Sequence, residues 1–248
     1  MRTLLQWPMS ILFIVQMYLA MLVLAIVFTP FAVFSRNAAY MAMFSYSRMV
    51  RFTARWMVGL RSEIRGQVPS FECVVAAKHQ SFFDILMIFG ALPRPKFIMK
   101  RELIYAPILG QYALKIGCVP VDRGKRGQAI AKMKADVAAG AADPGQIIIY
   151  PQGTRVAPGL RRPYKVGTGL LYEQLAQPCV PVATNVGLFW PKRSLLRQPG
   201  LAVVEFLAPI PPGQPVAAFM AALETAVETA SDRLLAEAGF VAPAPPKG

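Results

Sequence analysis

The sequence predicts an α/β fold: a largely parallel β-sheet flanked by helices, preceded by an N-terminal membrane-associated segment of two helices. Short apolar runs of strand length alternate with helical segments along the middle of the chain, which is typical of parallel sheets. The first 60 residues differ, because a long apolar stretch is followed there by a basic amphipathic one. We therefore expect a membrane-anchoring helical pair over residues 1–60, an α/β domain over 61–240 and a disordered proline-rich tail over 241–248.

The N-terminal part begins with an apolar stretch from Ser10 to Phe34, broken by little beyond Gln16 and Thr29. It exceeds the roughly 18 apolar residues expected of a transmembrane helix. Proline lacks the N–H that continues a helix, so we expect Pro30 to end it. No convincing small-residue cleavage site follows, so a removed signal peptide is not expected.

A second helix is predicted over residues 37–58. Arg48, Arg51 and Arg55 fall on one of its faces, and such basic amphipathic helices lie in the membrane interface. The arginines between Arg36 and Arg65 place the following domain on the cytoplasmic side. The expected location is the cytoplasmic face of the cell inner membrane, and the sequence leaves a single span and a dipped hairpin both open.

The domain that follows alternates strand-like and helix-like segments. The predicted strands are 73–77, 96–99, 118–121, 147–150, 180–184 and 202–206, and the predicted helices are 82–91, 125–139 and 164–176. A last amphipathic helix is expected over 217–238, with Glu224, Glu228 and Asp232 on a solvated face.

Composition favours a membrane partner. The chain has 27 Lys and Arg against 13 Asp and Glu, a formal net charge of +14, and a mean hydropathy of +0.42. A chain that is both basic and apolar is suited to the surface of an anionic bilayer. We expect no nucleic-acid partner, because zinc-finger spacing, an aromatic RNA-binding motif and a basic recognition helix are all missing from the sequence.

The three cysteines, Cys73, Cys118 and Cys179, are far apart and set in apolar strand-like runs. That pattern predicts buried structural thiols, which suits a reducing compartment. Their spacing matches no metal-binding motif, so no metal site is expected.

His79 is the only histidine in the chain, and it follows the predicted strand 73–77. Asp84 comes five positions later, in the first turn of a predicted helix. A carboxylate across such a turn can orient an imidazole so that the other ring nitrogen acts as a general base. The alternative is structural: Ser81 and Asp84 also fit a capping box, in which Asp84 only caps the helix.

A second group of polar residues follows the strand over 147–150. Pro151 ends this strand, Gly153 permits close backbone approach, and Thr154 and Arg155 follow. Ligands of open α/β sheets bind beside the carboxyl ends of the strands, and an arginine there suits phosphate or carboxylate. The alternative for this segment alone is a surface turn with a solvated arginine.

Together these segments resemble the glycerolipid acyltransferase family. His79–Asp84 (HQSFFD) matches the family signature H-x-x-x-x-D, and Tyr150–Arg155 (YPQGTR) is similar to its F-P-E-G-T-R block. Between and after them, Gly117–Arg123 and Cys179–Ala183 resemble two further blocks, and Lys100–Leu103 fits the linking segment. Four blocks in the right order, each at a strand end, make the resemblance strong. It is closest to the bacterial members that acylate 1-acyl-sn-glycerol-3-phosphate.

Three positions depart from the family pattern. Lys78 stands where an asparagine usually precedes the histidine, Gln152 replaces the glutamate of the E-G-T-R block, and Val156 replaces a serine that often follows its arginine. These changes concern acceptor binding and leave the proposed base and its orienting carboxylate in place.

The resemblance implies transfer of a fatty acyl group from a thioester, acyl-CoA or acyl carrier protein, to the free hydroxyl of 1-acyl-sn-glycerol-3-phosphate, giving phosphatidic acid without a cofactor. It also implies an N-terminal helical pair dipped into one leaflet. The catalytic pair would be His79 and Asp84. The candidate residues for substrate binding are Arg155, Gly153, Thr154, Arg123 and Lys100.

Three alternatives are kept. Gln152 leaves open another lysolipid acceptor, such as a lyso-ornithine lipid. Ser81 with His79 could form a serine hydrolase, although two residues apart on a tight turn they are poorly placed for attack. Finally, the fold could belong to a non-catalytic, membrane-bound anion-binding protein.

Overall fold

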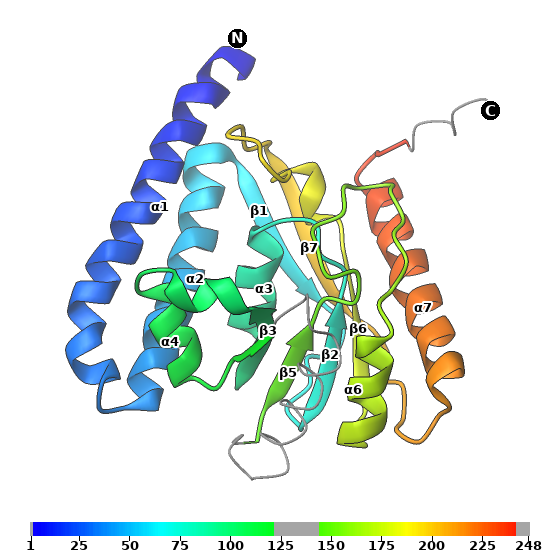
Figure 1. Ribbon diagram of the computed structural model, residues 1–248. Helices are drawn as coiled ribbons and strands as arrows, with labels where there is room; N and C mark the ends of the chain where they lie inside the picture. The colour runs from blue at the N-terminus through cyan, green and yellow to red at the C-terminus, as the bar shows by residue number, and fades with distance from the viewer. Residues whose placement is uncertain (1, 122–143, 242–248) are drawn as a thin grey trace.

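The computed structural model describes residues 2–121 and 144–241. The predicted helix over 125–139, the candidate residue Arg123 and nearly all of the tail lie outside these described residues. The described chain folds into a seven-stranded sheet with helices on both faces (Figure 1). The predicted α/β class is therefore confirmed.

The sheet is mostly parallel. Its strand order is β1-β7-β6-β2-β5-β3-β4; β6 and β7 run antiparallel, and the other neighbouring strands in this order pair in parallel. The strands are β1 (Leu60–Arg65), β2 (Cys73–Ala77), β3 (Pro95–Lys100), β4 (Val119–Val121), β5 (Gln146–Ile149), β6 (Cys179–Thr184) and β7 (Gly200–Phe206).

The six predicted strands are present, with ends within two residues of those expected. Strand β1 was missed. It is an edge strand that pairs with β7 alone, and charged residues alternate with others along it, at Arg61, Glu63 and Arg65. Only Leu60 of this strand is buried, so its apolar signal is weak.

The helices form two layers (Figure 1). On one side of the sheet lie α1 (Arg2–Ala32), α2 (Arg36–Val58), α3 (Phe83–Ala91) and α4 (Leu109–Lys115). On the other side lie α6 (Gly167–Leu175) and α7 (Val216–Glu237). Two short 3₁₀ helices, η1 (Arg101–Tyr105) and η2 (Val186–Leu188), complete the described elements.

The first helix runs two residues beyond Pro30, to Ala32, so the predicted stop at this proline was wrong. A proline removes only its own N–H bond, and a helix of this length tolerates the loss near its end. Ser35 then caps α2, because its side chain accepts a hydrogen bond from the N–H of Ala38.

Helix α1 presents apolar side chains to the outside. The stretch Leu5–Ala32 is long and apolar enough to cross a membrane, and only 17% of its most apolar window is buried. Large exposed side chains include Leu12, Leu19 and Ile26. Because the helices of soluble proteins usually bury such residues, this surface suits an apolar partner.

The inner side of α1 belongs to the main core. Phe13 is fully buried and meets the ring of Trp190 edge-on at 5.5 Å. The same hydrophobic cluster continues through α2 and α3 into the sheet. A second cluster lies between the sheet and the layer of α6 and α7, where Tyr172 stacks on Phe219.

All three cysteines are buried and unpaired, as predicted. Burial raises the pKa of the Cys73 thiol to about 12 and that of Cys118 to about 11. The thiols therefore stay protonated, as structural cysteines do.

Candidate active site

The parallel strands bring the candidate residues to one edge of the sheet. Strand β2 lies between β5 and β6, and β5 is followed by β3. His79 comes just after β2, Tyr150 just after β5, and Lys100 ends β3. Because parallel strands end at the same edge, these segments converge there.

His79 and Asp84 are paired. The Nδ1 atom of His79 lies 2.9 Å from Oδ1 of Asp84, and the carboxylate is fully buried whereas 13% of the His79 side chain is exposed. With Nδ1 engaged, Nε2 is the ring nitrogen available to a substrate, as a general base requires.

The second carboxylate oxygen of Asp84 forms hydrogen bonds with the backbone. Oδ2 accepts hydrogen bonds from the N–H groups of Gln80 at 2.8 Å and Ser81 at 2.7 Å. Asp84 therefore both stabilises the start of α3 and holds the imidazole, so the two interpretations of the sequence are compatible. Ser81 is fully buried, and its Oγ accepts a hydrogen bond from the N–H of Phe83, which speaks against Ser81 as a nucleophile.

Tyr150 contacts both His79 and Asp84. Its ring stacks on the imidazole with centroids 4.0 Å apart and planes 18° apart, and its hydroxyl donates to Oδ1 of Asp84 at 3.4 Å. Burial raises the pKa of Tyr150 well above its usual value, so the phenol stays protonated. The sequence analysis did not select Tyr150, although it occupies the aromatic position of the YPQGTR block.

A cavity of about 480 Å³ opens beside His79, a volume typical of small-molecule sites. Lys100, Gly153, Thr154 and Arg155 all line it. The structure thus gathers the described candidate residues for substrate binding, together with His79, around one pocket.

Most of the pocket wall is apolar. Side chains from four helices form it, including Met21, Ala25, Ala42, Met43, Tyr46, Phe82, Ile85, Phe89, Leu109 and Tyr112. The pocket therefore joins an apolar chamber between α1, α2 and α4 to a cationic mouth at the strand ends, which suits an amphipathic ligand.

The mouth holds a cation that the sequence analysis missed. Lys192 lines the pocket, and its Nζ lies 3.5 Å from Oγ1 of Thr154. It lies 37 residues beyond Arg155 in the chain, so no local pattern connects the two. Lys100 is half-exposed and pairs with Glu102 at 2.9 Å.

Gly153 adopts a positive φ of 66°, which lets Pro151–Arg155 turn tightly after β5. An added Cβ would lie 2.8 Å from Nζ of Lys165. The N–H of Gly153 donates to the carbonyl of Tyr150 at 2.8 Å. This amide is therefore used within the turn.

A buried polar network lies behind the catalytic pair. Lys78, immediately before His79, forms an ion pair with Glu228 of α7, and both side chains are at most 3% exposed. The hydroxyl of Tyr164 donates to Oε1 of Glu228 at 3.0 Å, and Nε2 of Gln152 lies 3.4 Å from the same atom. Placing Glu228 on a solvated face of the last helix was therefore wrong, because α7 turns this residue toward the sheet.

This network accounts for two departures from the family pattern. Lys78 and Gln152 both bind Glu228, and Gln152 is only 2% exposed and does not line the pocket. The change from glutamate to glutamine therefore adjusts the network behind the site without changing the charge at its mouth.

Within residues 2–121 and 144–241, His, Cys, Asp and Glu side chains form no group of three that could hold a metal ion. The chemistry available here is that of an imidazole–carboxylate pair beside cations.

Comparison with known proteins agrees with this geometry. The chain is 31% identical over 196 residues to 1-acyl-sn-glycerol-3-phosphate acyltransferase alpha of Mus musculus, covering 76% of this chain and 68% of that protein. It is 27% identical over 158 residues to 1-acyl-sn-glycerol-3-phosphate acyltransferase of Pseudomonas aeruginosa, covering 63% of this chain and 62% of that protein. The alignments thus span about two thirds of each relative.

The fold matches the crystal structure of the 1-acyl-sn-glycerophosphate (LPA) acyltransferase PlsC from Thermotoga maritima, with a TM-score of 0.77 over 95% of this chain and 98% of that one, at 19% identity. The model of the acyltransferase family matches residues 61–185. This region includes β2 to β6 and both segments that carry the candidate catalytic and binding residues. With half of its length matched in this way, the chain belongs to the acyltransferase family.

Proposed function

We propose that this protein transfers a fatty acyl group from an acyl thioester to the free hydroxyl of 1-acyl-sn-glycerol-3-phosphate, giving phosphatidic acid for phospholipid biosynthesis. The observation that carries the proposal is the 2.9 Å contact between His79 Nδ1 and Asp84 Oδ1 in the wall of a pocket that Arg155 also lines. The names of the two relatives, both 1-acyl-sn-glycerol-3-phosphate acyltransferases, support this acceptor.

In this reaction Nε2 of His79 accepts the proton of the acceptor hydroxyl as its oxygen attacks the thioester carbonyl. Asp84 stabilises the imidazolium that forms. The carbon–sulfur bond then breaks, and the departing thiolate takes the proton back from His79, so the enzyme returns to its starting state. A positioned base of this kind contributes about 100- to 10,000-fold in rate. No covalent acyl-enzyme and no cofactor are required.

The cationic mouth would bind the acceptor phosphate. Arg155 provides a planar guanidinium that can hold phosphate bidentately, and Lys192 and Lys100 add two further cations at the pocket wall. Thr154 offers a hydroxyl beside them. The apolar part of the pocket, bounded by α1, α2 and α4, would hold an acyl chain.

The proposed setting is the cytoplasmic face of the inner membrane, where lysophospholipid acceptors lie in the bilayer. The exposed apolar side of α1 would enter the lipid. Because the inner side of α1 lines the pocket through Met21 and Ala25, an acyl chain could pass from the bilayer into the pocket without crossing water. The donor partner is acyl-CoA or acyl carrier protein.

A different acceptor has lost its main support. The lyso-ornithine alternative depended on Gln152, which lies buried against Glu228 and away from the pocket. The cations at the mouth instead favour an acceptor with a phosphomonoester.

The test is an acyl-transfer assay on purified protein, with 1-acyl-sn-glycerol-3-phosphate and lyso-ornithine lipid offered side by side. Each acceptor is tried with acyl-CoA and with acyl carrier protein as donor. We expect phosphatidic acid from the first acceptor, and loss of this product in His79→Ala. Unchanged activity in His79→Ala, or no transfer by the unmutated chain, would support a non-catalytic role instead.

A further inference from the structure

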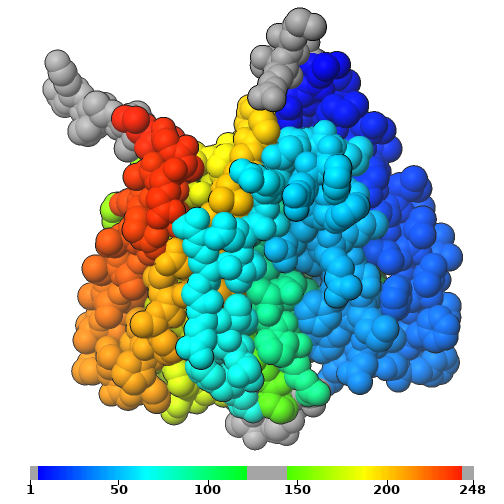
Figure 2. Space-filling view, turned by 180° about the vertical axis from the view of Figure 1, so that it is seen from behind, coloured from blue at the N-terminus to red at the C-terminus, as the bar shows by residue number. Residues whose placement is uncertain are grey.

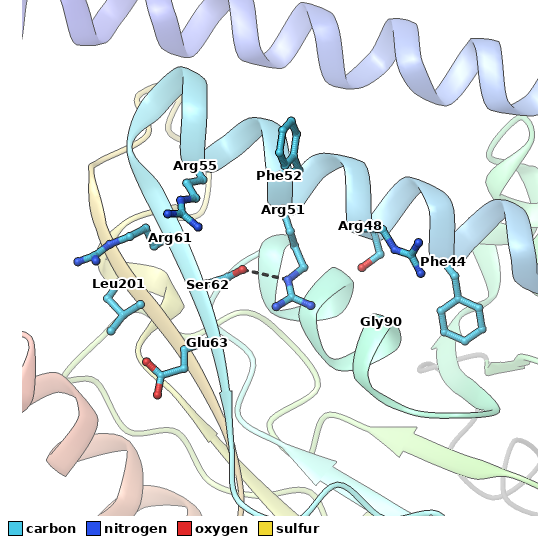
Figure 3. Close-up of a pocket in the computed structure, with 11 residues that line it drawn as sticks. Phe44, Arg48, Arg51, Phe52, Arg55, Arg61, Ser62, Glu63, Gly90 and Leu201 are labelled. Atoms are coloured by element: carbon cyan, nitrogen blue, oxygen red, sulfur yellow. Dashed lines mark hydrogen bonds between the residues drawn. The ribbon is translucent and has the colours of Figure 1, made fainter.

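A second cavity lies on the other flank of α2. It has a volume of about 500 Å³ and is formed by α2, β1, the end of α3 and β7 (Figure 3). Four of the residues that line it are arginines: Arg48, Arg51, Arg55 and Arg61. We call this cavity the arginine pocket. Figure 2 shows the face that carries it, where α2 and the chain that follows it lie between α7 and α1.

The spacing of residues in α2 builds this pocket. Arg48, Arg51 and Arg55 are three and four positions apart, so they project from one face of the helix. Arg61 joins them from β1. The helix itself separates the two cavities, since Ala42, Met43 and Tyr46 line the candidate active site instead.

Close packing of α2 on α3 forms the floor of the pocket. The hydroxyl of Ser47 donates to the carbonyl of Leu86 at 2.6 Å. Gly90 lies against this contact, and an added Cβ would be 2.5 Å from Oγ of Ser47. The contact between α2 and α3 thus fixes the shape of the floor of the arginine pocket.

The positive charge in the pocket is not balanced within the described chain. In the parts that the structure describes, no carboxylate forms an ion pair with Arg48, Arg51, Arg55 or Arg61. The one acid in the lining, Glu63, pairs with Arg65 at 2.8 Å. The pocket is therefore a concave cationic site.

Arg51 is held by a side-chain hydrogen bond. It is half-buried, and its Nε donates to Oγ of Ser62 at 2.9 Å, which fixes the plane of the guanidinium (Figure 3). Burial lowers the pKa of this guanidinium, as expected for a cation that has lost water without gaining an anion. A fixed and partly desolvated arginine is well suited to hold a phosphate group.

The pocket also adjoins an apolar surface. Phe52 and Trp56, on the same helix, are 62% and 72% exposed, and Figure 3 shows Phe52 projecting away from Arg51. The exposed apolar side of α1 runs alongside α2 (Figure 1). Aromatic side chains of this kind lie at the headgroup level of a bilayer. With these aromatic residues at that level, arginines on the same helix would lie near the lipid phosphates.

We propose that the arginine pocket binds the phosphate of an anionic phospholipid headgroup, as a non-catalytic site that fixes the orientation of the protein on the bilayer. The occupant is a lipid of the membrane rather than free phosphate, because three of the four arginines and the exposed aromatic residues are on one helix. The proposal is independent of the catalytic one, since neither His79 nor Arg155 lines this pocket.

The test is vesicle binding without an acyl donor. Full-length protein is added to phosphatidylcholine vesicles with and without 20 mole per cent phosphatidylglycerol, and the ratio of the two partition coefficients is measured. The apolar contribution of α1 cancels in this ratio, because it is the same for both kinds of vesicle. Phosphatidylglycerol is chosen because it is neither the proposed acceptor nor the proposed product.

Arg51→Gln should lower this ratio about fivefold, the effect expected of one cation near an anionic surface. The glutamine can still donate to Ser62, and a thermal unfolding curve verifies the fold. Arg94→Gln is the matched control: it removes one exposed arginine that lines neither pocket, and it should change the ratio less than about twofold. Replacing Arg51, Arg55 and Arg61 with lysine keeps the charge but loses the bidentate geometry, and should give an intermediate ratio.

An equal fall of the partition ratio in Arg51→Gln and Arg94→Gln would overturn the proposal. The attraction to anionic lipid would then come from the overall positive charge of the protein and not from the arginine pocket. A further arm adds soluble glycerol 3-phosphate in millimolar excess. Displacement of the protein from the phosphatidylglycerol vesicles, absent in Arg51→Gln, is expected, because the two phosphates compete for one site. Binding of glycerol 3-phosphate by a protein that partitions equally into both kinds of vesicle would instead assign the pocket to a free phosphate and overturn the lipid assignment.

Discussion

The ammonium group of Lys78 and the carboxylate of Glu228 form a buried ion pair, with Nζ 2.7 Å from Oε1 and 2.6 Å from Oε2. This pair connects the residue before His79 to the middle of α7, 150 positions away. Gln152, just before the turn at Gly153, binds the same carboxylate. The two segments that carry the candidate catalytic and binding residues are thus tied to one side chain.

The first prediction concerns this network. Glu228→Gln leaves the ammonium of Lys78 buried without its counter-charge, and removing one partner of a buried ion pair costs about 3–5 kcal/mol. Gln152→Glu should also destabilise, because it places a second carboxylate next to Glu228. Gln152→Glu combined with Glu228→Gln keeps one carboxylate in the network and should recover most of the loss. Denaturant unfolding measures all three, and an unchanged midpoint in Glu228→Gln would contradict this account.

The second prediction concerns the catalytic pair. His79→Ala should lower kcat by about 100- to 10,000-fold, because it removes the general base. Asp84→Asn keeps a side-chain oxygen for the N–H groups of Gln80 and Ser81 but loses the charge that stabilises the imidazolium. It should therefore reduce kcat strongly with a smaller effect on the unfolding temperature. Steady-state kinetics with matched unfolding curves check this, and full activity in Asp84→Asn would limit Asp84 to capping the helix.

The third prediction concerns Tyr150, whose ring stacks on His79 at 4.0 Å. Tyr150→Phe retains the stacked ring and loses only the long 3.4 Å hydrogen bond to Asp84, so kcat should fall less than about tenfold. Tyr150→Leu removes the ring and should reduce kcat much further by freeing the imidazole. Similar kinetics in the two variants would mean that the stacking does not position His79.

The fourth prediction concerns the cationic mouth. Arg155→Gln removes a charged donor, and hydrogen bonds to charged groups contribute about 1.5–3 kcal/mol, so kcat/KM for the phosphorylated acceptor should fall about 10- to 100-fold. The loss should appear mainly in the KM of the acceptor and leave that of the thioester unchanged. Lys192→Gln should act in the same direction more weakly, because Lys is a point charge without a planar fork. A selective rise in the KM of the thioester would contradict this prediction and would assign Arg155 and Lys192 to binding of the donor.

The fifth prediction concerns the thiols. Burial raises the pKa of Cys73 to about 12 and that of Cys118 to about 11, from an ordinary value of 9.0. Iodoacetamide at pH 8 should therefore label neither residue in the folded protein and label both after unfolding, as mass spectrometry can show. Above about pH 9 the unfolded chain loses these protons and the folded one retains them, so stability should fall as pH rises. Labelling at equal rates in the two states would contradict the burial.

The sequence predicted those parts of the site that depend on local patterns. His79 and Asp84 are five positions apart, and Gly153 to Arg155 are consecutive, so each group could be recognised from its spacing and its place after an apolar strand. Their approach to one another followed from the parallel sheet, because β2 and β5 are neighbours.

What could not be predicted depends on contacts distant along the chain. Lys192 reaches Thr154 from a loop beyond β6, and Glu228 meets Lys78 across 150 residues. Glu228 occupies a position that helical periodicity alone assigns to the solvated face. Glu228 is buried because its carboxylate pairs with the buried ammonium of Lys78. The periodicity of a helix carries no information about such a partner.

The contacts of α1 have a practical consequence for anyone preparing this protein. Phe13 covers Trp190, Thr29 meets the hydroxyl of Tyr112 at 3.1 Å, and Gln6 donates to the carbonyls of Val58 and Arg197. Cutting away the first 35 residues to obtain a water-soluble fragment would uncover Trp190 and one wall of the apolar chamber. Such a truncation should aggregate, and crystallisation or cryo-microscopy is better begun with the whole chain in detergent or nanodiscs.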